Sequence, residues 1–310
     1  MTQLTGTRAG AAPSSARPAP RRRRRSLVPY LYVLPAFVVF AVFLGVPFLQ
    51  SIQYSFYDWD GLSPATWAGF ANYAGVVTDP QLRASFGHAL VLMVFYAAIP
   101  VVVALFLTAL ISRANGLRGM SFFRTVLFLP QVIASVVVAT IWVSIYSADG
   151  LLNDGLRLVG LGQFAQVWLG GYDTALPAIG FVGTWLNVGL CLVLFLSGVG
   201  NIHPSLFEAA RIDGAGAARE FFSITLPSLR GQIAAALTLT VVSALKTFDL
   251  VYVTTSGGPG NSTSVPAFEA YNRAFQTGQV GSAAAVAVSL TVVIMIVTAL
   301  IGRLQPKDVA

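Results

Sequence analysis

The sequence predicts an all-α integral membrane protein with six transmembrane helices. Hydrophobic residues make up 55% of the 310 residues, and the mean hydropathy is +0.73. Charged residues make up only 10%, whereas a soluble globular domain carries about 25%. Long apolar runs also recur along the chain, each near the roughly 20 residues that a helix needs to cross a bilayer.

Six apolar segments are long enough to span the hydrocarbon core. In chain order they are residues 28–50, 88–112, 122–146, 176–199, 230–255 and 281–302. Several prolines lie inside these segments or at their edges, namely Pro35, Pro47, Pro100, Pro130 and Pro177. Membrane helices tolerate such prolines because neighbouring helices can satisfy the freed backbone groups.

The transmembrane domain therefore covers about residues 28–305. Residues 1–27 form a tail rich in Ala, Pro, Ser and Arg. Such a composition cannot bury a core, so we expect this basic cytoplasmic tail to be disordered. The apolar run that follows is longer than the core of a signal peptide, which favours an uncleaved first span. Residues 306–310 form a second, short cytoplasmic tail.

The basic residues predict the orientation in the cell membrane. Most of the 19 Lys and Arg residues lie in the N-terminal tail, after the second span, after the fourth span or at the C-terminus. The positive-inside rule places these segments, and hence both chain termini, in the cytoplasm. Membrane topology thus explains the net charge of +7, and a nucleic-acid partner is not needed.

The segment 204–228 is polar and lies between the fourth and fifth spans. Ser205 followed three residues later by Glu208 matches a capping box, which predicts a helix that begins at Leu206. A helix of about two turns is marginal alone, so we expect it to pack against a neighbour.

This short helix is expected to run to Asp213 and to end at Gly214, which suits the left-handed C′ position. A second short helix is expected from about Ala217 to Ile224. Pro227 then marks the entry to the fifth span. Together these elements predict a compact cytoplasmic loop built from two short helices.

Polar residues inside the spans are candidates for a solute pathway because each costs free energy in a bilayer. The fourth span carries Trp185 and Asn187, and the fifth carries Thr240, Ser243 and Thr247 on one helical face. Hydroxyls, an amide and an indole suit a neutral polyol. The alternative for the hydroxyls is hydrogen bonding between helices. Asn187 is the leading candidate, since an unpaired amide in lipid is costly.

Charged side chains of the fifth span have a different interpretation. Lys246 and Asp249 are three residues apart, which favours a structural ion pair near the outer end of that span. Cys191 lies in an apolar run, and His88 and His203 have no partner at ligand spacing, so the sequence predicts no metal site.

The sequence predicts no ATPase site and no catalytic residues. A P-loop requires Gly-Lys followed by Ser or Thr. The only lysines in this sequence are Lys246, which follows Leu245, and Lys307, which follows Pro306. We therefore expect no cofactor on this chain, and ATP-driven work would need a separate subunit.

The polar loop resembles the EAA loop of permease subunits in binding-protein-dependent ABC importers. The matching pattern is Glu208-Ala209-Ala210, then Gly214, then Ile224-Thr225-Leu226-Pro227. Other segments resemble the carbohydrate branch, the maltose and glycerol-phosphate type: Arg118-Gly119, Phe122-Phe123-Arg124, Phe128-Leu129-Pro130, Phe248-Asp249-Leu250 and the run Thr255 to Thr263. The resemblance covers about residues 28–305.

The resemblance implies that this loop couples the chain to a cytoplasmic ATPase dimer, which would bind ATP and Mg. The coupling residues it implies are Glu208, Ala209, Ala210, Asp213, Gly214, Ile224, Leu226 and Pro227. It also implies a second six-span permease subunit, an extracellular solute-binding protein and a sugar substrate. The chain itself would be embedded in membrane lipid.

Two alternatives remain open at this point. The first is a permease of the same class for another polar solute, such as glycerol phosphate or a polyamine. Lys246 is the one candidate cation on the pathway, which favours a neutral sugar over a highly anionic solute. The second alternative is a secondary transporter that works alone on an ion gradient. It would need intramembrane carboxylates, and Asp249 is the single candidate inside a predicted span.

Overall fold

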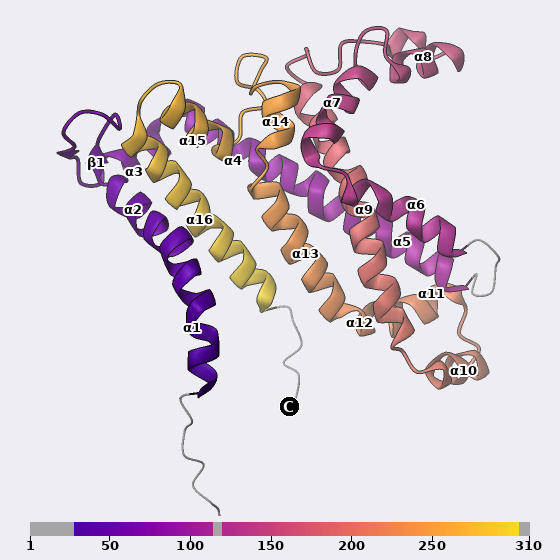
Figure 1. The fold of residues 1–310 in the computed structure, drawn as a ribbon. Helices are drawn as coiled ribbons and strands as arrows, with labels where there is room; N and C mark the ends of the chain where they lie inside the picture. The colour runs from indigo at the N-terminus through magenta and orange to yellow at the C-terminus, as the bar shows by residue number, and fades with distance from the viewer. Residues whose placement is uncertain (1–27, 114–119, 304–310) are drawn as a thin grey trace, which may run out of the picture. The chain divides into compact units, whose positions relative to one another are not determined.

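The computed structural model describes residues 28–113 and 120–303, and these are helical almost throughout (Figure 1). The predicted tails, 1–27 and 306–310, and the Arg118-Gly119 pair lie outside the described residues. The chain divides into two units, Met1–Phe48 and Leu49–Ala310. In the first unit and across its boundary, α1 (Val28–Phe40), a π-helical turn (Ala41–Gly45) and α2 (Val46–Tyr54) follow one another directly.

The second unit contains the remaining helices and one short hairpin. The short elements outside the loop between α9 and α13 are β1 (Tyr57–Asp58), β2 (Thr66–Trp67), α3 (Ala71–Thr78), α8 (Leu151–Leu158), a 3-10 turn (Gly162–Phe164), α14 (Asp249–Thr254) and α15 (Pro266–Phe275). The long helices are α4 (Pro80–Met93) continuing through a π-helical turn (Val94–Ala98) into α5 (Ile99–Arg113), α6 (Met120–Val132), α7 (Ser135–Ile145), α9 (Ala175–Gly200), α13 (Arg230–Leu245) and α16 (Val280–Gly302). The loop helices are α10 (Pro204–Ile212), α11 (Ala217–Glu220), a π-helical turn (Phe221–Thr225) and α12 (Leu226–Ser228).

Four helices in the described residues are long and apolar enough to cross a membrane. They are Leu31–Tyr54, Pro80–Ser112, Ala175–Gly200 and Val280–Gly302. The number rises to six if each of two bent helix pairs counts as one span. The chain is therefore a mostly helical protein with four to six candidate membrane helices.

The first bent pair falls in the third apolar segment, and the second joins the end of the polar loop to the fifth apolar segment. Arg124–Val132 and Ser135–Ile145 meet at 104°, and Ala217–Ser228 and Arg230–Leu245 meet at 67°. Pro130 lies in the last turn before the first bend, where its ring and missing N–H disrupt the helical hydrogen bonds. The third apolar segment is thus a broken helix.

Each π-helical turn in the described residues lies just before a proline. Pro47, Pro100 and Pro227 each stand two residues beyond the end of such a turn. A proline cannot donate a backbone hydrogen bond, and its ring clashes with the carbonyl four residues earlier. Widening of the preceding turn relieves that clash without ending the helix. These prolines therefore change the direction of side chains while the helix continues.

Helix α9 lies at the centre of the second unit, where it packs against α5, α6, α13 and the π-helical turn after α4. Two glycines permit this close approach. A Cβ at Gly189 would lie 2.1 Å from the Leu127 carbonyl oxygen, and one at Gly183 would lie 1.9 Å from the Tyr96 ring. Small residues at such contacts are the usual means by which membrane helices approach one another.

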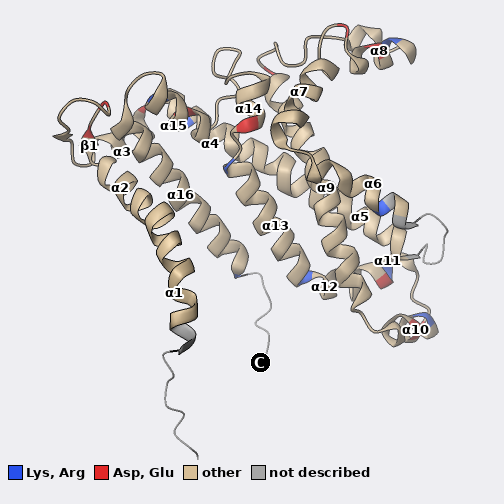
Figure 2. Ribbon diagram, in the orientation of Figure 1, with Lys and Arg blue, Asp and Glu red and all other residues tan. Residues whose placement is uncertain are grey.

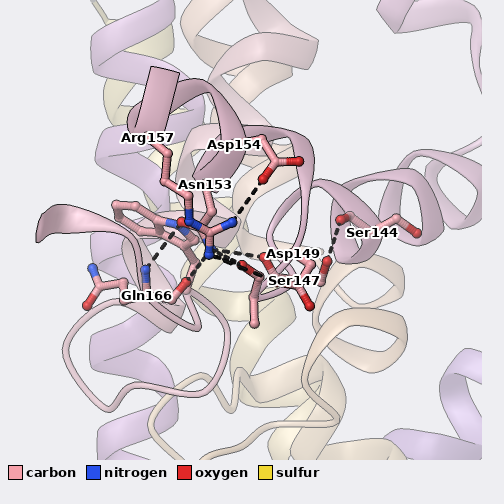
Figure 3. A network of polar contacts seen from close by, with 9 residues as sticks. Ser144, Ser147, Asp149, Asn153, Asp154, Arg157 and Gln166 are labelled. Atoms are coloured by element: carbon pink, nitrogen blue, oxygen red, sulfur yellow. Dashed lines mark hydrogen bonds and ion pairs between the residues drawn. The ribbon is translucent and has the colours of Figure 1, made fainter. Parts of the chain in front are cut away.

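The loop between α7 and α9 is held by one buried amide, that of Asn153 (Figure 3). Asn153 on α8 donates to the carbonyls of Ser147, Ala148 and Gln166, and its oxygen accepts from Gln166 N and Trp168 Nε1. Arg157 adds an ion pair of 2.9 Å with Asp154. The buried amide therefore makes this turn-rich segment an ordered element.

A second polar cluster joins α4 to α15. Asp79 caps α4 by accepting from Gln81 N at 2.8 Å, and it also forms an ion pair with Arg273, which donates to Ser282. Partial burial raises the pKa of Asp79. Hydrogen bonds from Arg273 and Gln81 and the charge of Arg273 lower the pKa by more than burial raises it. The net result is a pKa below 3.8.

We therefore expect Asp79→Asn to lower the thermal stability of the detergent-purified protein at neutral pH, by about 1 kcal/mol. Because the folded-state pKa is depressed, this stabilisation is present above about pH 3.8 and is lost as the pH falls through the folded value. The difference in melting temperature between wild type and variant should narrow in that acidic range. A difference that stays constant with pH would contradict the ion pair's contribution.

Candidate functional site

The first helix of the loop between α9 and α13 begins earlier than the sequence predicts. Helix α10 starts at Pro204, and His203, not Ser205, is its N-cap. The His203 Nδ1 accepts the backbone N–H of Ser205 at 3.4 Å. The predicted capping box is therefore wrong. Pro204 explains the difference, because its fixed φ and missing N–H suit the first helical position.

The C-terminal end of α10 confirms the prediction for Gly214. The helix ends at Ile212, and Gly214 has φ +73°. The backbone N–H of Gly214 donates to the Arg211 carbonyl and that of Ala215 to the Ala210 carbonyl. These two bonds form a Schellman motif, which requires the left-handed conformation that glycine adopts without strain.

The second helical part of the loop is longer than predicted. α11, its π-helical turn and α12 run from Ala217 to Ser228, whereas the sequence analysis expected an end near Ile224. Ile224 lies in the π-helical turn, and Leu226 and Pro227 lie in α12. The chain then bends into α13 at Leu229.

An ion pair that the sequence analysis missed joins the two helical parts. Arg211 Nε on α10 lies 3.1 Å from Glu220 Oε1 on α11. The Glu220 side chain is only 11% exposed, whereas that of Arg211 is 67% exposed. Opposite charges nine residues apart, with a glycine turn between them, were the signal that could have revealed this link. The ion pair links the two short helices across the glycine turn.

The loop presents an exposed face. Helix α10 has no buried residue, and Glu208, Ala209, Asp213 and Gly214 are all exposed while Ala210 is half-buried. The basic residues of α6, α10, α11 and α13 gather around this end of the helices (Figure 2). The structure thus places the expected coupling residues of α10 on an accessible, charged surface.

A large cavity of about 1330 Å³ lies behind this face. Its apolar wall comes from α5, α9 and the second helical part of the loop, and its charged residues are Arg124, Glu208, Arg211 and Glu220. Glu208 is thus part of both the exposed face and the cavity. Because this cavity separates them, the loop can move toward α5 and α9 without a steric clash.

A second cavity, of about 450 Å³, lies between α9, α13 and the joint of α6 with α7. Three of the five predicted pathway residues line it, namely Asn187, Ser243 and Thr247. Asn187 Nδ2 donates to the Gly183 carbonyl at 2.8 Å, and Thr247 Oγ1 donates to the Ser243 carbonyl at 2.9 Å. The wall therefore combines amide, hydroxyl and apolar groups.

The other two predicted pathway residues lie elsewhere. Thr240 is fully buried and donates to the Ala236 carbonyl at 2.8 Å. The Trp185 ring packs on Trp142 with centroids 5.7 Å apart, and neither ring lines the cavity. Thr247 does not share with Thr240 and Ser243 the helical face that the sequence predicts, because α13 ends at Leu245 and the chain turns there.

The predicted ion pair between Lys246 and Asp249 is wrong. Among the described residues no ion pair joins them, and Asp249 Oδ2 accepts a hydrogen bond from Ser135 Oγ at 2.6 Å. Lys246 caps the end of α13 whereas Asp249 begins α14, so the turn between them separates residues that one continuous helix would bring together. Both side chains are exposed and line the second cavity.

Tyr96 is a cavity residue that the sequence analysis missed. It lies in the π-helical turn after α4, its side chain is 2% exposed, and its hydroxyl makes no hydrogen bond within the described part of the chain. A buried hydroxyl without a partner is costly. Pro100, which distorts this turn, was the available signal. Tyr96 thus helps to form the cavity wall, while its hydroxyl is buried beside Thr247 and out of reach of a solute.

The sequence and the fold of this chain resemble those of known proteins. Residues 90–307 match the family described as binding-protein-dependent transport system inner membrane component. The probable ABC transporter permease protein YurN of Bacillus subtilis is 35% identical, over 92% of this chain and 96% of its own. The diacetylchitobiose uptake system permease protein NgcF of Streptomyces coelicolor is also 35% identical, over 91% of this chain and 84% of its own.

A solved structure shares the fold. It is the crystal structure of a bacterial ABC transporter involved in the import of the acidic polysaccharide alginate. The matched chain has a TM-score of 0.75 and 22% identity, with 92% of this chain and 97% of that chain covered.

Proposed function

The chain belongs to the family of binding-protein-dependent transport system inner membrane components, and from this premise we propose that it lines the path of a sugar or oligosaccharide through an ATP-driven importer. It is a multi-pass membrane protein and a transport permease. In the proposed arrangement it has six spans, with both termini in the cytoplasm, and it acts beside a second permease subunit. An extracellular solute-binding protein delivers the sugar.

The cavity of about 450 Å³ is the observation that carries the proposal of a polar solute. Binding sites for small molecules combine an apolar wall with a few polar groups that orient the ligand. Asn187, Ser243 and Thr247 supply such groups. The relative NgcF is a permease protein of a diacetylchitobiose uptake system, which supports a sugar as the solute.

The loop between α9 and α13 is the proposed contact with a cytoplasmic ATPase dimer. ATP and Mg bind on that dimer and not on this chain. Glu208, Ala209, Asp213 and Gly214 form its exposed part, and the half-buried residues of the proposed contact are Ala210, Ile224, Leu226 and Pro227. The Arg211–Glu220 ion pair and the Schellman turn support this role. They make the loop stiff, and a stiff loop transmits a displacement of the ATPase to α13.

The test of the whole proposal is co-purification followed by reconstitution. The chain should purify with an ATPase and a second permease. In proteoliposomes with the solute-binding protein, the complex should take up at least one of diacetylchitobiose and maltose. Uptake by the purified chain alone would overturn the ATP-driven mechanism. Preference for glycerol 3-phosphate over both sugars would overturn the choice of solute.

Within this complex, Asn187→Leu should reduce uptake about ten-fold, the effect of losing one hydrogen bond of about 1.4 kcal/mol to the solute. The substitution retains the size of the side chain and leaves the Gly183 carbonyl bonded within α9, so the protein should fold normally. Thr291→Val is the control, because that hydroxyl lies in α16 and bonds only the Ala287 carbonyl of its own helix. Equal uptake by the two variants would exclude Asn187 from the pathway.

A further inference from the structure

Four aromatic side chains form a continuous row that begins at the second cavity. Phe248 and Tyr252 are stacked with centroids 5.2 Å apart, and Tyr271 packs on both, at 5.2 Å from Phe248 and 5.4 Å from Tyr252. Phe275 extends the row, with its centroid 5.3 Å from that of Tyr271. We call these four residues the aromatic row.

The aromatic row joins the cavity to the molecular surface. Phe248 is a lining residue of the cavity, next to Lys246 and Asp249. At its other end Phe275 is 75% exposed, and Tyr252 between them is 42% exposed. Two elements supply the rings: Phe248 and Tyr252 lie at and within α14, whereas Tyr271 and Phe275 lie on α15. Exposed apolar side chains are common in this protein, so what distinguishes this row is its contact with the cavity.

We propose that the aromatic row is a sugar-binding platform along which a sugar ring approaches the cavity. This inference rests on the proposed function and names the groups that would hold the solute before it reaches Asn187. A sugar ring carries apolar C–H groups on its faces and hydroxyls at its edge. An aromatic ring can stack on the C–H groups, and the tyrosine hydroxyls can form hydrogen bonds with the sugar hydroxyls.

A second aromatic cluster in the same protein does not contact the second cavity. Trp142 packs on Tyr146, Phe181 and Trp185, with centroids 5.0 to 5.7 Å apart. Phe181 is 53% exposed, but these rings are absent from the cavity wall. Continuity with a polar cavity therefore distinguishes the aromatic row, and Phe181 provides a matched control.

The experiment is equilibrium binding of radiolabelled diacetylchitobiose and maltose to the purified complex of both permeases with the ATPase, without the solute-binding protein. Tyr252→Ala and Tyr271→Ala should each raise the dissociation constant of the bound sugar about three- to ten-fold. Tyr252→Phe and Tyr271→Phe retain the ring and should recover most of the affinity. Phe181→Ala should bind as the wild type does.

The possible results separate this inference from the proposed function. If the wild-type complex binds and imports neither sugar, the choice of a sugar is wrong and the platform is withdrawn with it. If it binds a sugar but the alanine variants bind equally well, only the platform is overturned. Loss of the second permease from complexes that carry Tyr252→Ala or Tyr271→Ala would show instead that the row is a subunit interface, which also overturns the platform.

Discussion

Gly214→Val is expected to abolish import while the assembled complex still hydrolyses ATP. Gly214 has φ +73°, and its Schellman turn orients α10 relative to α11. The left-handed conformation costs an ordinary L-residue about 1–2 kcal/mol, and a β-branched residue tolerates it least. The turn should therefore open, and α10 should no longer transmit motion. We expect uptake to fall at least ten-fold with ATPase activity largely retained, measured together in proteoliposomes.

Gly216→Val is the matched control for this experiment. Both glycines lie in the same turn, and an added Cβ meets no atom within 4 Å at either position. Gly216 has φ −76° and ψ 173°, a conformation that valine adopts readily. The two variants thus differ in backbone conformation and not in available space. If both retained normal import, the proposed coupling role of the loop would be refuted.

Gly183→Ala is expected to disrupt the cavity of about 450 Å³ and so to prevent most sugar uptake. The new Cβ would lie 1.9 Å from the Tyr96 ring, so the ring or helix α9 must move to make room for it. Overpacking of this kind costs about 1–3 kcal/mol. α9 and the π-helical turn should separate and displace both Tyr96 and Asn187. We expect a lower melting temperature and loss of most sugar uptake.

Gly87→Ala is the control for helical glycine replacement. Gly87 lies in α4, earlier in the same long helix as Tyr96, and a Cβ there meets nothing within 4 Å. In a helix, alanine is favoured over glycine by about 0.5–1 kcal/mol, so this variant should be at least as stable as the wild type. Normal import by Gly183→Ala would mean that the contact with Tyr96 is not needed for the cavity.

The resemblance read from the sequence identified the family, and apolar run length predicted the helical membrane class. Both follow from local patterns. A bilayer requires about 20 apolar residues per helix wherever they occur in the chain, and the loop motif is a short run of residues with fixed spacing. The end of α10 could also be predicted from local residues, because the turn that closes this helix needs a positive φ, which Gly214 adopts without strain.

Local patterns failed where a helix changes direction. The pairing of Lys246 with Asp249 and the shared face of Thr240 and Thr247 both assumed one continuous helix. The turn after Leu245 breaks that periodicity. At the start of α10, Pro204 moved the N-cap to His203 because backbone geometry outweighed the side-chain motif.

The sequence by itself determined the membrane class, the family and the residues of the loop between α9 and α13, since these depend on composition and on residues near one another in the chain. Only the tertiary structure decided which polar side chains share a cavity. Asn187 on α9, Ser243 on α13 and Tyr96 in the turn after α4 meet because Gly183 lets two helices approach closely and because Pro100 widens a helical turn. Such encounters depend on packing between distant segments, which residue spacing along one helix does not encode.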